Sequence, residues 1–266
     1  PFVWKDNKVR DLYDSMLKGF PIGYIMLWES PTDYEDKKTS IGVGEKSYKV
    51  PKDLVIDGQQ RLTALVASMY GMYVRDRNFK ERRIRISYNP ISREFDVWTQ
   101  AIQNNPEYIP DISEVFAAKR NDASPDFRKE YIEALNRSRH KRGEEMLTGK
   151  EESQIEKNIN ALLNLESYIV PSLEIARSAS EEDVADIFVR VNSAGQKLTE
   201  NDFILTLVSV YEKERRDQID KFCADSRTPT DKTSFNHLIE VDPSHIVRMV
   251  VGVGFQRARL RYAYMI

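Results

Sequence analysis

One run of the sequence, residues 54–63, constrains the fold most, because it passes from a strand pattern to a helix pattern with almost no loop between them. Leu54-Val55-Ile56 is a short apolar segment typical of a buried strand. The segment ends at Asp57-Gly58, a turn dipeptide, and a helix is predicted from Gln59 to about Tyr70. The apolar residues that recur at helical spacing, and so predict the core-facing stripe, are Leu62, Leu65, Val66 and Met69. A strand joined directly to such a helix indicates a fold that combines sheets with helices.

The remaining pattern predicts an α/β (α+β) chain, with a mixed part at residues 1–105 and a mainly helical part at 106–266. Strands at 82–88 and 94–99 are predicted to pair across an Asn89-Pro90 turn. The other predicted elements are helices at 5–19, 112–118, 125–139 and 151–169, strands at 24–28 and 172–176, and mostly helix after 203. The segments 180–183 and 199–202 have the spacing of a capping box, which predicts two further helix starts.

Composition and charge exclude several classes of protein. The 266 residues carry 40 Lys and Arg against 42 Asp and Glu, so a general basic coat for nucleic acid is excluded while a local basic patch is not. The single cysteine, Cys223, excludes disulfides within the chain and a cysteine-rich zinc site. No apolar run approaches the about 18 residues of a membrane span, and we expect a cytoplasmic protein. Because the sequence starts without Met and stops in an apolar stretch, we expect a fragment of a longer protein.

Four polar side chains gather where the predicted helix begins: Asp57, Gln59, Gln60 and Arg61. A helix N-terminus has unpaired N–H groups and the positive end of the helix dipole, so it attracts anions such as phosphate. In a catalytic site, Arg61 pairs with phosphate, Asp57 holds a metal ion or orients water, and the two amides position phosphate oxygens or the attacking water. A structural alternative stays open, in which Asp57 is the N-cap and Gln60 completes a capping box.

The segment Asp57-Gly58-Gln59-Gln60-Arg61-Leu62-Thr63 follows two others, Phe2-Val3-Trp4-Lys5 and Gly19-Phe20-Pro21-Ile22-Gly23. It precedes a third, which runs from Phe188 through Asn192 and Gly195 to Asp202. In this order the segments resemble the motifs of the GmrSD-type restriction endonucleases, whose signature is Asp-Gly-Gln-Gln-Arg. The resemblance spans residues 1 to about 205, and it implies a ParB/sulfiredoxin-like fold for the first part of the chain.

This resemblance implies a nucleotide-triphosphatase and sensor domain of anti-phage defence. Family members recognise modified DNA and couple that recognition to nucleotide hydrolysis and DNA cleavage. The implied ligands are therefore a GTP-like nucleoside triphosphate, Mg²⁺ or another divalent cation at Asp57, and double-stranded DNA. The implied nuclease is a separate domain or subunit of the His-Asn-His type, and no membrane partner is expected. The alternatives are a module that binds nucleotide or DNA without hydrolysis, and a scaffold for the nuclease subunit.

Further residues are predicted to contact the nucleotide: Gly58, Thr63, Asn192, Gly195 and Lys197. Asn192 offers a donor and an acceptor, Gly195 can adopt a positive φ, and Lys197 can reach a phosphate. We expect the segment around Asn192 to lie beside the Asp57 cluster. The alternative is a joint between two helices, in which Asn192 and Gly195 end one helix and residues 199–202 begin the next.

Three clusters of basic residues are candidates for contacts with DNA phosphates. They are Arg75, Arg77, Lys80, Arg82, Arg83 and Arg85; then Arg137, Arg139, Lys141 and Arg142; then Arg257, Arg259 and Arg261. The second is the most compact and is the predicted DNA-binding cluster. The alternative for each cluster is a solvated charged face. The tryptophans Trp4, Trp28 and Trp98 are expected in the core rather than stacked on bases.

Overall fold

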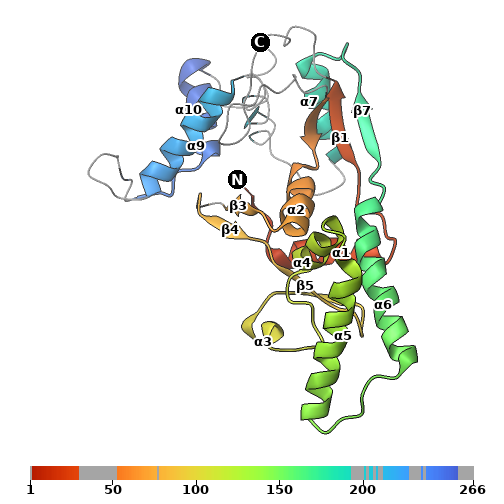
Figure 1. Ribbon diagram of the computed structural model, residues 1–266. Helices are drawn as coiled ribbons and strands as arrows, with labels where there is room; N and C mark the ends of the chain where they lie inside the picture. The colour runs from red at the N-terminus through yellow and green to blue at the C-terminus, as the bar shows by residue number, and fades with distance from the viewer. Residues whose placement is uncertain are drawn as a thin grey trace. The chain divides into compact units, whose positions relative to one another are not determined.

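The computed structural model describes residues 2–29, 53–76, 78–192, 212–227 and 238–256, with the single positions 201, 204, 205, 208 and 235 (Figure 1). Its contacts group the chain into two compact units, each made of two stretches of sequence. The first unit is Pro1–Gly23 with Gln59–Pro171, and the second is Tyr24–Gly58 with Ser172–Ile266. This grouping differs from the linear division near residue 105, because the strands before that position and the helices after it share one core.

The first unit combines helices with two small β-hairpins. Its elements are α1 (Asp6–Leu17), α2 (Gln59–Tyr70), β3 (Tyr73–Arg75), β4 (Glu81–Arg83), β5 (Ile86–Asn89), β6 (Glu94–Val97), α3 (Gln100–Gln103), α4 (Ile112–Arg120), α5 (Ser124–Lys141), α6 (Gly149–Leu163) and the 3₁₀ helix η2 (Asn164–Ser167). The strand pairs β3–β4 and β5–β6 are both antiparallel. The mixed α/β class and the predicted helices of this unit are confirmed, with shifts of a few residues at their ends.

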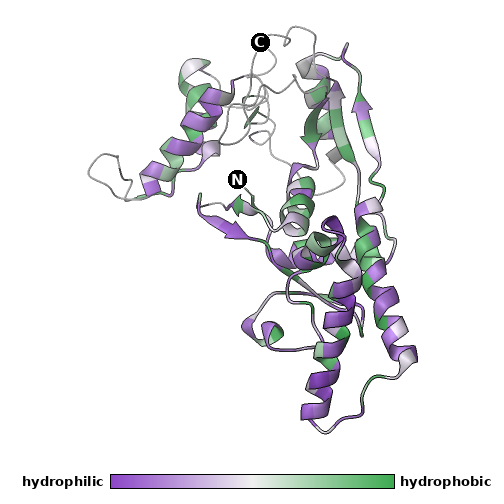
Figure 2. Cartoon of the chain, viewed as in Figure 1, coloured by the Kyte–Doolittle hydropathy of each residue, from purple (hydrophilic) through white to green (hydrophobic). Residues whose placement is uncertain are grey.

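The core of the first unit is built largely from apolar stripes along its helices. Helix α1 buries Val9, Leu12, Tyr13 and Met16. Helix α6 starts at a capping box between Thr148 and Glu151. Its buried residues are Ile155, Asn158, Ile159, Leu162 and Leu163. Figure 2 shows α5 as hydrophilic over most of its length, and Tyr131, Ile132, Leu135 and Asn136 are its buried residues. Each helix therefore packs on the core along a narrow apolar face.

Two predictions within the first unit are wrong in detail. The single strand expected at 82–88 is two short strands, because β4 pairs with β3 whereas β5 pairs with β6. The stripe expected on α2 includes Val66, yet Val66 is 48% exposed and Ser68 is fully buried. A buried serine is tolerated here because its hydroxyl is hydrogen-bonded, at 2.7 Å from the Tyr13 hydroxyl and 2.5 Å from the Ala64 carbonyl oxygen.

The second unit contains a three-stranded sheet. Its described elements are β1 (Ile25–Glu29), β2 (Asp53–Asp57), β7 (Ser172–Ile175), α7 (Glu181–Asn192), α9 (Lys213–Arg227) and α10 (Pro243–Gly254). Strand β1 lies between the other two strands, antiparallel to β2 and parallel to β7. This central position explains why β1 buries residues on both faces.

Strand β2 is less buried than its apolar sequence predicts. Ile56 is its one buried residue, while Leu54 and Val55 are half-buried. Among the described strands β2 lies at the end of the sheet, so it has a strand neighbour on one side. The second unit's core at this sheet joins Ile56 to Met26, Trp28 and Phe188.

The predicted start of the helix after residue 180 is confirmed by its capping contacts. The Asp183 N–H donates to the Ser180 hydroxyl at 3.2 Å, and the Ser180 N–H donates to the Asp183 carboxylate at 3.1 Å. The second predicted capping box, at 199–202, lies outside the described residues, as does the loop expected at 31–50. In the described part of the chain, no helix has the combined length and apolar character needed to cross a membrane.

Candidate functional site

The motif of residues 57–63 lies where strand β2 gives way to helix α2. Asp57 is the last residue of β2, its backbone is paired with Met26 of β1, and its side chain is half-buried. Gly58 is buried and has a φ of +93°, a conformation that L side chains rarely adopt. Gln59 then begins α2 and is exposed. Glycine is therefore the residue best suited to this position between the strand and the helix.

The helix begins one residue later than the capping-box alternative requires. With α2 starting at Gln59, Gly58 precedes the helix, and Gln60 is its second residue rather than its third. The carboxamide oxygen of Gln60 accepts a hydrogen bond from the backbone N–H of Val3 at 2.8 Å. Gln60 therefore ties the start of α2 to the N-terminal segment of the first unit.

That N-terminal segment is itself held in place by the first unit. The Phe2 N–H donates to the carbonyl oxygen of Arg75 at 2.7 Å, and the Phe2 side chain is buried in the core. The contact between Val3 and Gln60 thus joins two segments that lie 57 residues apart in the sequence. Both segments carry motifs of the family resemblance, and the structure brings them together.

A second long-range contact of the motif involves Arg61 and Gly23. Gly23 has a φ of +88°, and a Cβ atom placed on it would lie 3.1 Å from the Nη2 atom of Arg61 and 3.4 Å from its Cζ atom. The guanidinium group therefore passes directly over the backbone of Gly23, where any side chain would crowd it. The segment 19–23 and the motif at 57–63 meet at this point, although the sequence alone suggested no partner for Arg61 within the chain.

The other predicted nucleotide contacts are placed only in part. Thr63 lies in the second turn of α2 and is exposed. Asn192 is the last residue of α7, and its side chain lies outside what the structure describes. Gly195, Lys197 and Asp202 also lie outside the described residues. The expected position of this segment beside Asp57 stays a prediction.

The predicted DNA-binding cluster lies at the C-terminal end of α5 and just beyond it. Arg137 pairs with Glu133 at 3.6 Å, and Arg142 pairs with Glu144 at 3.0 Å. Arg139 donates through Nε to the carbonyl oxygen of Glu145 at 2.6 Å. Lys141 and Arg142 are exposed. Basic residues at this end also complement the helix dipole, so the cluster has a structural role whether or not it contacts DNA. The third basic cluster, from Arg257, lies outside the described residues.

The tryptophans and the cysteine occupy different environments. Trp28 is buried in the core of the second unit, and Trp4 packs partly buried against the core of the first. Trp98 is half-buried and lines a surface hollow instead of the core. Burial raises the pKa of the Cys223 thiol to about 11, so little of it is thiolate near neutral pH.

Asp57 is chemically suited to a magnesium ion. Mg²⁺ is usually held by one or two carboxylates together with substrate phosphates and water, rather than by a cage of protein ligands. A half-exposed carboxylate at the end of a strand is compatible with that pattern. In the described ranges, no group of three or more His, Cys, Asp or Glu side chains is placed to hold a metal ion.

Comparison with known proteins gives a match at the level of a family. No curated protein matches the chain. The family model of the GmrSD restriction endonuclease N-terminal domain matches residues 1–209, a range that includes the motif at 57–63 and the segment around Asn192.

Proposed function

This chain belongs to the family of GmrSD restriction endonuclease N-terminal domains, and we propose that it hydrolyses a nucleoside triphosphate as the sensor part of a modification-dependent restriction system. In this proposal, recognition of modified double-stranded DNA is coupled to hydrolysis, and DNA cleavage belongs to a His-Asn-His-type nuclease domain or subunit. In this proposal the protein acts in the cytoplasm.

The observation that supports this proposal most directly is the proximity of Arg61 to Gly23. Arg61 belongs to the first turn of α2, where backbone N–H groups lack intrahelical acceptors. Its guanidinium lies beside Gly23. A preorganised cation beside a helix N-terminus favours a phosphate group. Such groups stabilise the charge that develops during phosphoryl transfer without having to reorganise.

The remaining motif residues have complementary roles in the proposal. Asp57 would hold a divalent cation such as Mg²⁺ or orient the attacking water, and the exposed Gln59 would position water or a phosphate oxygen. Gly58 allows the turn that places Asp57 next to the helix in the chain. The hydrogen bond from Val3 to Gln60 holds the first turn of α2, which also carries Arg61, against the N-terminal segment. A bound divalent cation supplies charge neutralisation on the phosphates.

Further nucleotide contacts are proposed from the segment around Asn192 and from helix α2. Thr63, Asn192, Gly195 and Lys197 would complete the binding of a GTP-like nucleotide, with Lys197 acting as a point charge on a phosphate. The matched family range includes all four positions.

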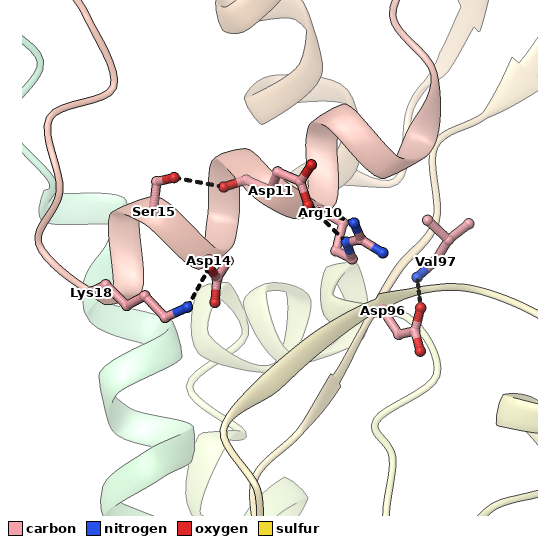
Figure 3. A network of polar contacts seen from close by, with 7 residues as sticks. All are labelled: Arg10, Asp11, Asp14, Ser15, Lys18, Asp96 and Val97. Carbon is pink, nitrogen blue, oxygen red and sulfur yellow. Dashed lines mark hydrogen bonds and ion pairs between the residues drawn. The ribbon is translucent and has the colours of Figure 1, made fainter.

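Release of inorganic phosphate from GTP and ATP, with and without DNA, tests the proposal. We expect Asp57→Ala and Arg61→Ala each to lower turnover at least about 100-fold, as loss of one preorganised electrostatic group commonly does. The matched control is Arg10→Ala, which removes a surface arginine of α1 whose ion pair is with the adjacent Asp11 (Figure 3).

The outcomes separate the proposed activity from its alternatives. Wild-type turnover in both motif variants, with circular dichroism unchanged, would contradict the assignment of the site. Nucleotide binding without phosphate release would indicate a binding module, and absence of both nucleotide and DNA binding would indicate a scaffold.

A further inference from the structure

A hollow of about 290 Å³ on the first unit is separate from the residues of the 57–63 motif. It is lined by Asp6, Tyr73, Arg83, Arg85 and Trp98. These residues come from the start of α1, from both strands of the β3–β4 hairpin and from the segments beside β5 and β6. This volume is close to the lower limit of about 300 Å³ for small-molecule sites, so a ligand here would be small and partly exposed.

One wall of the hollow is an aromatic and cationic stack. The guanidinium carbon of Arg85 lies 4.1 Å from the centroid of the Trp98 ring. The Trp98 indole N–H donates to Gln103 at 2.9 Å, and the Trp98 backbone N–H donates to the Arg85 carbonyl oxygen at 3.2 Å. The two side chains are therefore held as a unit. A guanidinium plane that rests on an aromatic ring offers its other face to a further flat group.

A second wall is formed by Arg83, whose positive charge is paired with a buried carboxylate. Arg83 donates to the buried carboxylate of Asp111 at 2.9 Å and to the Ser113 hydroxyl at 3.2 Å. Its Nε atom is buried and has no hydrogen-bond acceptor among the described residues. Because this atom is buried, it is not accessible to a ligand in the hollow.

The remaining residues of the hollow are the acidic Asp6 and the aromatic Tyr73. The carboxylate of Asp6 is paired with Arg82 at 2.6 Å, which offsets its repulsion of an anion. Tyr73 is 66% exposed and offers a second ring. Together the hollow combines surfaces for stacking a flat ring with arginine donors suited to a phosphate.

We propose that this hollow binds a nucleoside phosphate, with the base stacked against Arg85 and Tyr73 and the phosphate paired with the arginine side chains. The ligand is a nucleotide unit of a DNA strand or a free nucleotide, since both present this chemistry. The proposal assigns a function to part of the basic cluster at 75–85 that the 57–63 motif does not use.

Fluorescence anisotropy of a labelled 12-nucleotide single strand tests the proposal on the 266-residue chain, without any triphosphate. We expect Arg85→Gln, Trp98→Leu and Tyr73→Ser each to weaken binding at least about fivefold, the effect of losing about 1 kcal/mol of base stacking. Trp98→Phe keeps an aromatic ring and should retain most of the affinity. Because Tyr73 is exposed, Tyr73→Ser tests the hollow even if Trp98→Leu does not fold.

The control variant is Arg10→Gln, which removes the same charge from the α1 surface shown in Figure 3. Competition with deoxyadenosine monophosphate separates the two sources: displacement at similar nucleotide concentration indicates a free nucleotide, and failure to displace indicates a strand. Unchanged affinity in the three hollow variants, an equal loss in Arg10→Gln, or no binding of either probe would overturn the proposal. The assay contains no triphosphate, so its result does not depend on hydrolysis at Asp57.

Discussion

At the scale of single residues, the contact between Gly23 and Arg61 is the feature on which the candidate site depends most. The positive φ of Gly23 favours glycine at this position. A Cβ atom there would lie 3.1 Å from a guanidinium nitrogen of Arg61, so Arg61 would have to shift by a few tenths of an ångström. Gly19, four residues earlier, also has a positive φ of +70°, but a Cβ atom there would meet nothing within 4 Å. Substitutions at Gly19 and at Gly23 both strain the backbone, but only the substitution at Gly23 also displaces Arg61. Comparing the two therefore separates these effects.

Gly23→Ala is therefore expected to weaken nucleotide binding about tenfold, because the new methyl group displaces a charged hydrogen-bond donor. Gly19→Ala should leave nucleotide binding unchanged. Both variants should lose about 1–2 kcal/mol of unfolding free energy from the strained φ. Isothermal titration with a non-hydrolysable triphosphate and urea denaturation measure the two effects. Equal nucleotide affinity in the two variants would mean that the position of Arg61 does not matter for binding.

At the scale of elements, the C-terminal end of α5 is where local charge balance and DNA binding make different predictions. The glutamates at 133 and 144 each lie within 4 Å of one arginine of the cluster, so part of its charge is already compensated. Exposed ion pairs of this kind contribute little to stability, and a DNA phosphate can replace the glutamate at small cost. The cluster therefore remains a proposed contact for DNA.

Replacing Arg139, Lys141 and Arg142 by Gln tests this contact through the dependence of DNA affinity on salt. Each phosphate contact that is lost should reduce the slope of log K against log salt by about 0.9, because fewer counterions are released. Filter binding with a short duplex across a range of salt concentrations measures the slope. A slope equal to that of the wild type would show that this end of α5 is a solvated charged face.

At the scale of the whole molecule, the core of the first unit joins segments from both sides of residue 105. Tyr13 of α1, Tyr88 of β5 and Tyr131 of α5 are all buried in it. Burial raises the pKa of Tyr88 from its ordinary value of 10.0 to about 12. Burial also raises the pKa values of Tyr13 and Tyr131 above their usual range. The unfolding free energy therefore depends on whether these three tyrosine hydroxyls are protonated.

This linkage predicts a loss of stability at alkaline pH. An unfolded tyrosine ionises near its ordinary pKa of 10.0, whereas folded Tyr88 stays neutral until about pH 12. The unfolded state thus binds fewer protons in this range, and the unfolding free energy falls as the pH rises from 10 toward 12. Below pH 10.0 the contribution of Tyr88 to the unfolding free energy is fully present.

Urea denaturation of wild type and of Tyr88→Phe, from about pH 8 to about pH 11.5, measures this effect. The variant should show a shallower decline above about pH 10, since it has lost one of the linked groups. Tyr70→Phe is the matched control, because Tyr70 is 54% exposed. Parallel curves for wild type and Tyr88→Phe would contradict the linkage.

The whole chain is also expected not to cut DNA by itself. Its sequence has no His-Asn-His pattern, and the proposed function places cleavage in a partner domain or subunit. Purified chain incubated with plasmid and Mg²⁺ should leave the supercoiled form intact. Metal-dependent nicking that a point mutation within the chain abolishes would show this prediction to be wrong.

The sequence by itself determined the features that depend on neighbouring residues. Apolar residues at helical spacing predicted α1 and α6, and the spacing from Ser180 to Asp183 predicted the start of α7, because these patterns act within one or two turns. The ordered motifs likewise indicated the family, since they are readable without any contact between them.

Only the tertiary structure decided what depends on partners distant in the sequence. Ser68 can be buried because Tyr13 supplies a hydroxyl across the core, whereas Val66 of the same helix is exposed. Arg61 meets Gly23, and Gln60 meets Val3, through contacts that no local pattern encodes. A side chain's periodicity predicts which face of a helix it occupies, but the atoms that face it come from whichever segment the fold brings there, and those atoms determine its burial and its role.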